Sequence, residues 1–124
     1  MTADELKELF APFAAVEVKR MFGGHGIYAE GVCFAIQTSG GEAFLKVDPE
    51  TQPAFLKAGS SPFIYQAKGK ARPTSFWRLP AAAYDEADEL IRWAGLGVAA
   101  AKRAAAAKSK PKGRIKGTAR ARAR

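Results

Sequence analysis

The stretch RMFGGHGIYAEGVCFAI, residues 20–36, gathers the residue types of this 124-residue chain that most often do chemistry. It contains four glycines together with His25 and Cys33, the only histidine and the only cysteine of the chain. Such a cluster suits one of four roles: binding a phosphate, holding a metal, supplying a nucleophile, or turning the backbone. The neighbouring residues decide among these roles.

A nucleotide site is the first candidate, because residues 24–29 fit the dinucleotide pattern G-x-G-x-x-G/A. That pattern binds a pyrophosphate only when a strand precedes it and a helix follows, since the helix N-terminus faces the phosphates. Here the following residues are strand-like and reach another turn within a few positions. No acid ends a second parallel strand about twenty residues further on. The match is therefore interpreted as a coincidence of glycine density, and no cofactor is predicted.

Catalysis and metal binding make demands that the sequence does not meet. A catalytic triad needs a histidine between a nucleophile and an orienting acid, and a metal site needs more ligands than His25 and Cys33 supply. Cys33 lies between Val32 and Phe34, so a buried and inert thiol is predicted. We expect no catalytic residue, no metal ligand and no enzyme, and we interpret the glycines as turn formers.

The charge of the chain is divided unevenly between its two parts. Residues 1–97 carry a net charge of −2, whereas residues 98–124 contain ten Lys or Arg and no acid, so their net charge is +10. One cysteine permits no internal disulfide, the amphipathic start MTADELKELF is unlike a secretory signal, and no apolar run approaches the length of a membrane span. These features predict a cytoplasmic protein, with association with the nucleoid as one possibility.

The elements that must position these residues follow from local patterns. Thr2 and Glu5 form a capping box, and an apolar stripe from Leu6 to Phe13 predicts the first helix. Alternation predicts strands over VEVKRMF, GIYA and VCFAIQT, and AFLKV is a further strand-like run. Asp48 and Pro49 suit the start of a short second helix.

The remaining segments complete the predicted order. PFIYQA and SFWRL are predicted strands joined by the basic loop KGKARPT. The last helix is predicted over PAAAYDEADELIRWAGLGVAAAKR, starting at Pro80, with Gly95 and Gly97 as residues that could weaken or end it. The order is helix, three strands, helix, two strands, helix. Short connections favour a mainly antiparallel sheet with helices on one face, a two-layer α+β domain. This domain is predicted to span residues 1–97, and residues 98–124, rich in Ala, Lys and Arg, are predicted to form a largely disordered basic tail.

The sequence also resembles a known family. RMFGGHGIYAEGVCFAI, then FLKVD, PFIYQAKGK and FWRLP, occur in an order similar to the amino-terminal domain of the TfoX/Sxy family, named for bacterial competence regulators. The resemblance covers roughly residues 5–100. It implies a small α+β domain without catalytic residues. Some members carry a second, helical domain, and this chain has the basic tail in that place.

The basic segments are the candidate functional site. Unopposed cations attract polyanions, and the alternating arginines at the C-terminus suit phosphate contacts rather than base recognition. A hairpin tip carries the weaker candidates Lys68, Lys70 and Arg72. The aromatic residues Tyr65, Phe76, Trp77 and Trp93 are interpreted as core rather than as stacking surfaces. The predicted nucleic-acid-binding residues of the tail are Lys102, Arg103, Lys108, Lys110, Lys112, Arg114, Lys116, Arg120, Arg122 and Arg124.

Two functions remain open. The first is a non-enzymatic accessory or regulatory protein whose tail binds the backbone of DNA or RNA without sequence preference. The second is a protein-interaction module that contacts the transcription machinery, with a tail that only aids solubility. Neither function involves a membrane or a small-molecule substrate.

Overall fold

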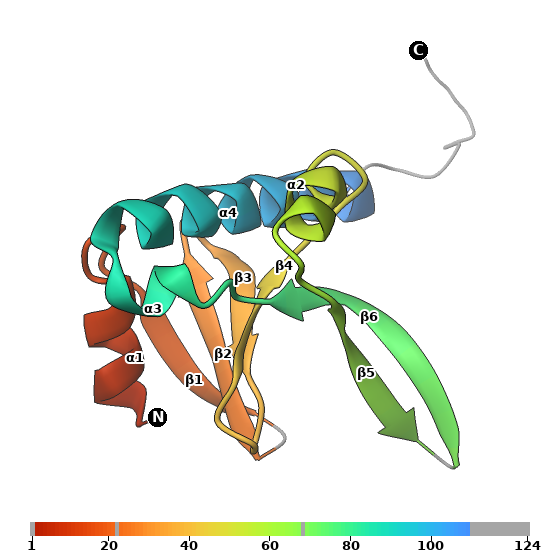
Figure 1. Cartoon of the computed structure of the whole chain (residues 1–124). Helices are drawn as coiled ribbons and strands as arrows, with labels where there is room; N and C mark the ends of the chain where they lie inside the picture. The colour runs from red at the N-terminus through yellow and green to blue at the C-terminus, as the bar shows by residue number, and fades with distance from the viewer. Residues whose placement is uncertain (1, 22, 68, 110–124) are drawn as a thin grey trace.

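A computed structural model describes residues 2–21, 23–67 and 69–109. Helix α1 (Ala3–Phe10) leads into four strands: β1 (Glu17–Met21), β2 (Gly24–Ala29), β3 (Val32–Gln37) and β4 (Ala43–Lys46). Helix α2 (Gln52–Lys57) follows, then β5 (Pro62–Ala67) and β6 (Lys70–Arg78), and the helices α3 (Ala82–Asp85) and α4 (Ala87–Ser109) end the described chain (Figure 1).

The six strands form one sheet in the order β1-β2-β3-β4-β6-β5, and every neighbouring pair is antiparallel. The predicted α+β class with a mainly antiparallel sheet is therefore confirmed. Four strands rather than three precede α2, because AFLKV pairs between β3 and β6 as strand β4. Most of the predicted loop KGKARPT is also strand, because β6 begins at Lys70 and pairs with β5 from there.

Local signals explain the first helix well. The Thr2 side chain accepts the N–H of Glu5, and the Glu5 carboxylate accepts the N–H of Thr2, which is the predicted capping box. Two of its apolar side chains, Leu6 and Phe10, are fully buried, and the Phe10 ring meets the Phe34 ring edge-on at 5.3 Å. The stripe therefore docks α1 on the sheet.

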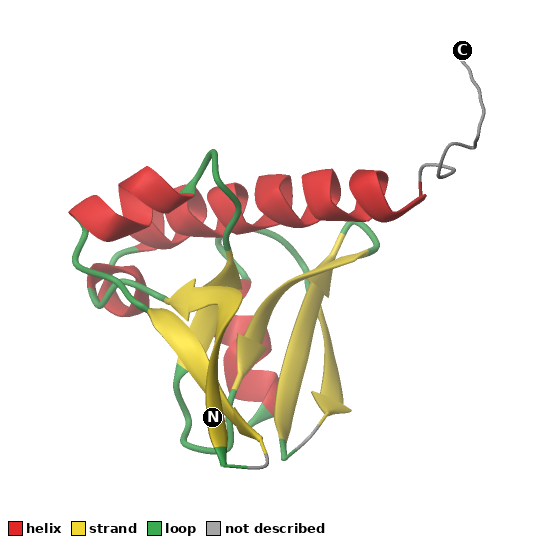
Figure 2. Cartoon of the chain, turned by 90° about the vertical axis from the view of Figure 1, so that its right-hand side faces the viewer, coloured by secondary structure: helices red, strands yellow, loops and turns green. Residues whose placement is uncertain are grey.

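Helix α4 is the longest element and packs across β3 and β4 (Figure 2). Its core contacts include Leu90, Trp93 and Ala94, which are almost fully buried, and the Trp93 ring lies 4.8 Å from the ring of Phe55 on α2. Where the sequence predicted one helix from Pro80, the structure has two, because Glu86 adopts an extended conformation between α3 and α4.

The predicted domain boundary after residue 97 falls inside α4, which continues without a break to Ser109. Val98, Ala100 and Ala101 are buried, with at most 5% of each residue exposed. Residues 98–109 were assigned to the tail, although the predicted last helix already extended to Arg103, and they form the end of α4. Burial of these small apolar side chains against the domain favours the helical state of an alanine-rich stretch that already has high helix propensity.

Candidate nucleic-acid interface

The first two predicted tail cations lie on α4 and face carboxylates of the domain itself. The Lys102 ammonium forms an ion pair with Glu30, in the turn between β2 and β3. The Arg103 guanidinium bonds to Asp48 through two nitrogen–oxygen contacts and lies 2.7 Å from the carboxylate of Glu50. In the folded domain these two cations therefore pair with carboxylates, and their contact with nucleic acid stays a prediction.

The other predicted tail cations fall beyond the part of the chain just described. The side chain of Lys108, in the last turn of α4, lies outside the described residues. The same holds for every predicted residue C-terminal to it: Lys110, Lys112, Arg114, Lys116, Arg120, Arg122 and Arg124. Their role stays a prediction.

The hairpin candidates Lys70 and Arg72 lie on β6, in the hairpin β5–β6 that extends away from the rest of the domain (Figure 1). Lys70 is exposed at the start of β6, and Arg72 pairs with Tyr65 in the backbone register, although its side chain lies outside the described part, as Lys68 does. In both ribbon views the hairpin tip points away from the end of α4 (Figures 1 and 2). The described parts of the hairpin and α4 thus do not join into one basic surface.

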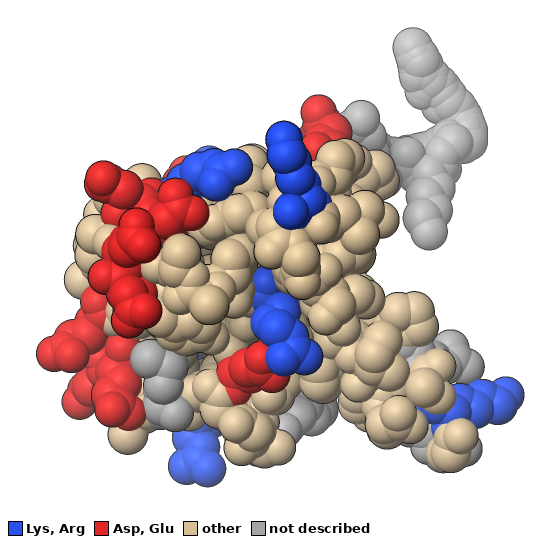
Figure 3. Space-filling view, in the orientation of Figure 1, with Lys and Arg blue, Asp and Glu red and all other residues tan. Residues whose placement is uncertain are grey.

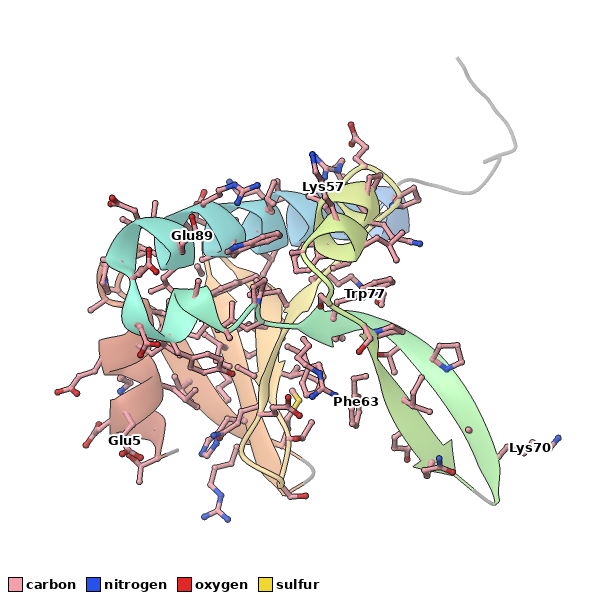
Figure 4. All side chains as sticks on the ribbon, in the orientation of Figure 1. Glu5, Lys57, Phe63, Lys70, Trp77 and Glu89 are labelled. Atoms are coloured by element: carbon pink, nitrogen blue, oxygen red, sulfur yellow. The ribbon has the colours of Figure 1, made fainter. Side chains whose placement is uncertain are left out.

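Acidic side chains gather at the opposite end of α4 from Ser109. Figure 3 shows them over α1, α3 and the first turn of α4, and Glu5 and Glu89 mark this region in Figure 4. At 1.5 Å per residue the 23-residue helix α4 is about 34 Å long, so it separates the acidic end from its own C-terminus. The acidic residues of this end are Asp4, Glu5, Glu8, Asp85, Glu86, Asp88 and Glu89.

The glycine cluster serves strand pairing as well as turning. Gly23 has a positive φ of 81°, as a turn former should, but Gly24 lies in β2. A Cβ on Gly24 would lie 1.9 Å from the carbonyl oxygen of Gln37 on β3. This glycine is therefore required because two strands approach closely, which the interpretation as turn formers missed. Residues 24–29 continue as strand rather than helix, so the G-x-G-x-x-A match lacks the geometry of a phosphate site.

His25 and Cys33 lie at different positions of the β2–β3 ladder and do not form a common site. His25 Nδ1 lies 2.8 Å from the side-chain oxygen of Gln37, whereas Cys33 pairs with Tyr28 further along the β2–β3 ladder. Burial raises the pKa of the Cys33 thiol, and its Sγ donates to the carbonyl of Ala35 at 3.4 Å. No group of three His, Cys, Asp or Glu is placed to hold a metal within residues 2–21, 23–67 and 69–109.

Sequence reasoning missed an exposed aromatic surface. Trp77 and Trp93 are buried, as predicted, with 8% and 3% exposed. Tyr65 is 54% exposed, and Phe76 is only half-buried, because strand alternation turns both away from the helices. The alternation of Phe76 with Trp77 was the signal that one of the two aromatic residues must face outward.

The described geometry defines a small α+β domain with strongly separated charges. Residues 8–101 match the model of the TfoX N-terminal domain, and the chain belongs to that family. The family is a competence-related regulatory one rather than a catalytic one. The matched region ends at Ala101, inside α4, in agreement with the burial of Val98, Ala100 and Ala101. No curated protein matches the chain. Among the described helices, none has the length and apolar character needed to cross a membrane.

Proposed function

We propose that this chain is a non-enzymatic regulatory protein whose basic C-terminal segment binds nucleic-acid backbone without sequence preference. The observation that carries the proposal is the charge separation along α4. The helix begins at the acidic end of the domain and ends about 34 Å away from it. From the last turn of the helix onward the sequence has eight Lys or Arg, Lys108 to Arg124, and no acid among them.

Phosphate contacts of this kind act through counterion release. Each phosphate that a cation neutralises adds about −0.9 to the slope of log affinity against log salt concentration. Eight cations set a limit of about −7, and roughly half of that limit is expected for a segment that contacts phosphates incompletely. Lys102 and Arg103 add little, since both would first have to leave their carboxylates.

The test is a fluorescence anisotropy titration of the full chain with a labelled duplex at several salt concentrations. A variant of the full chain with Gln at every Lys and Arg of 110–124 should lose most of the affinity and most of the salt slope. A control variant, Lys7→Gln with Lys57→Gln, removes exposed cations of α1 and α2 and should bind like the wild type. Equal binding by the wild type and the neutralised variant would refute the proposal.

The second candidate, a protein-interaction module with a solubilising tail, is favoured by one observation. A groove of about 610 Å³ opens between β5 and the ends of β1–β3, and exposed apolar residues border it. A pull-down from nuclease-treated extract that recovers one defined protein through this groove, and no nucleic acid, would favour this function over the first.

A further inference from the structure

The face of the sheet turned away from the helices carries aromatic and cationic side chains. Cross-strand partners share a face, so Ile36, Phe44 and Arg78 lie together on it, one from each of β3, β4 and β6. Their neighbours Ala35, Leu45 and Trp77 point to the helices and the core. We call the first side the helix-free face.

Aromatic rings on the helix-free face carry cations above them. Lys19 Nζ lies 4.9 Å from the centroid of the Tyr28 ring, and Lys46 Nζ lies 5.2 Å from that of Phe76. The Arg78 guanidinium lies 5.7 Å from the Phe44 ring, which also packs at 5.1 Å against Phe63. Ring–cation pairs thus join β1 to β2 and β4 to β6 on this face, and Phe63 of β5 packs beside the second group.

A groove on this face lies between β5 and the ends of β1–β3. Phe63 and Tyr65 come from β5, Met21 and Ile36 come from β1 and β3, and Figure 4 shows Phe63 between the body of the domain and the hairpin. Its volume of about 610 Å³ lies within the range of ligand-sized clefts, about 300–1,000 Å³.

His25 and Gln37 also border this groove, but their side chains, which hydrogen-bond to each other, belong to the helix-facing side of the sheet, because Gln37 pairs with the buried Ala43. The walls that the helix-free face supplies are therefore mainly apolar and aromatic. Such walls suit the flat face of an aromatic heterocycle, which can stack on them.

The charges around the groove favour an anionic partner. Lys19 lies on β1 beside one wall, and Lys70 lies at the tip of the hairpin that forms the other wall (Figure 4). The acids of this face are Glu17 on β1 and Glu42, which is held in an ion pair by Arg78. Most of the acidic side chains lie instead over α1, α3 and the start of α4 (Figure 3).

We propose that the helix-free face binds single-stranded nucleic acid, with one unstacked base in the groove between Tyr65 and Ile36. Base–aromatic stacking requires bases that have left the duplex, and neighbouring cations then contact the phosphates. This inference rests on the proposed function, because the ligand is again nucleic acid. It adds that the bound strand is single. The basic segment supplies sequence-independent attraction, and the groove supplies preference for single strands.

The experiment compares an oligothymidine with a duplex of equal phosphate number, each labelled with a fluorophore, for the full chain and its variants. The wild type should bind the single strand more tightly. Tyr65→Ala should weaken binding of the single strand about five- to 150-fold and leave duplex binding unchanged, because one base loses its stacking partner. Tyr65→Phe keeps the ring and should keep the affinity. Leu56→Ala is the control, since Leu56 is an exposed apolar residue on α2 and does not line the groove.

The outcomes separate this inference from the function on which it rests. If Tyr65→Ala and Leu56→Ala bind the single strand equally well, or if single strand and duplex bind alike, the groove does not bind bases. A tail-dependent, salt-sensitive affinity would still stand in that case. If the chain with a neutralised tail binds as tightly as the wild type and Tyr65→Ala does not, the tail proposal fails and the groove remains. In a last case an acidic peptide displaces the oligonucleotide from the wild type but not from Tyr65→Ala, and the wild type shows no preference for single strands over duplex. That result would overturn the groove proposal in favour of a protein partner.

Discussion

Arg103 on α4 holds Asp48, a residue 55 positions earlier in the chain, through two hydrogen bonds. Its Nε lies 2.5 Å from Oδ2 of the carboxylate and its terminal nitrogen lies 3.1 Å from Oδ1. The same carboxylate accepts the backbone N–H groups of Glu50 and Thr51, each at 3.1 Å. The Asp48 carboxylate therefore links α4 to the turn that precedes α2. Its partner Arg103 is a residue for which the sequence predicted contact with nucleic acid.

Replacing Asp48 with asparagine should lower the free energy of unfolding at neutral pH by about 1 kcal/mol, because an ion pair that solvent partly screens contributes up to about that much. The hydrogen bond from Arg103 is the largest cause that lowers the pKa of Asp48, from 3.8 to about 2. A carboxyl whose pKa is depressed in the folded state stabilises the protein above its unfolded pKa and loses this effect as the pH falls toward the folded value.

The difference in stability between wild type and Asp48→Asn should therefore be complete above about pH 5 and shrink between pH 5 and pH 2. Urea denaturation across this range measures it. Glu50→Gln is the matched control, because Glu50 also contacts Arg103 but is 69% exposed, and its effect should be smaller. A constant difference down to pH 2 would contradict the assigned pKa.

Truncation should show where the folded unit ends. A chain that stops after residue 97 loses the buried Val98, Ala100 and Ala101, so its melting temperature should fall by about 10 °C or more. A chain that stops after Ser109 keeps every described element and should melt within a few degrees of the full chain. Thermal unfolding followed by circular dichroism distinguishes the two. Equal stability of the two truncated chains would mean that residues 98–109 contribute nothing to the fold.

Gly95 and Gly97 lie two positions apart in α4. A side chain added at Gly95 should stabilise the protein, whereas one added at Gly97 should destabilise it. A Cβ on Gly95 would have its nearest neighbour at 4.0 Å, so Gly95→Ala should stabilise the helix by about 0.5–1 kcal/mol. A Cβ on Gly97 would lie 3.2 Å from the carbonyl oxygen of Phe34 and 3.3 Å from Leu45, so Gly97→Val should destabilise the protein by about 1–3 kcal/mol. Chemical denaturation of both variants tests this, and the same sign for both would show that α4 does not lie so close to β3.

Cys33 should react slowly with alkylating reagents. Burial is the main cause that raises the pKa of its thiol above 9.0, and only the thiolate is a strong nucleophile. At pH 8 iodoacetamide should therefore modify the folded protein at least about tenfold more slowly than the urea-unfolded chain, and the rate should rise as the pH passes 9. Mass spectrometry of timed samples gives both rates. A folded-state rate equal to the unfolded one would mark the thiol as accessible and ionised.

Local chemistry made several parts of this structure predictable. The capping box at Thr2 and the stripe through Leu6 and Phe10 involve residues close together in the chain, and α1 begins and packs as they predict. Alternation located the strands, although AFLKV was left out of the predicted strand order and the start of β6 was placed several residues too late. The charge separation between residues 1–97 and 98–124 is a property of composition and needs no structure.

Other features depend on residues that are distant in sequence, and only the tertiary structure decided them. The length of α4 depends on what Val98 and Ala101 bury against, and the need for Gly24 depends on the position of the Gln37 carbonyl. The partners of Lys102 and Arg103 lie in a β-turn and a loop far earlier in the chain. A sequence reveals that a side chain is cationic, aromatic or small, because these are properties of the residue. Which surface it meets is set by the packing of strands and helices, because burial and ion pairing act through space.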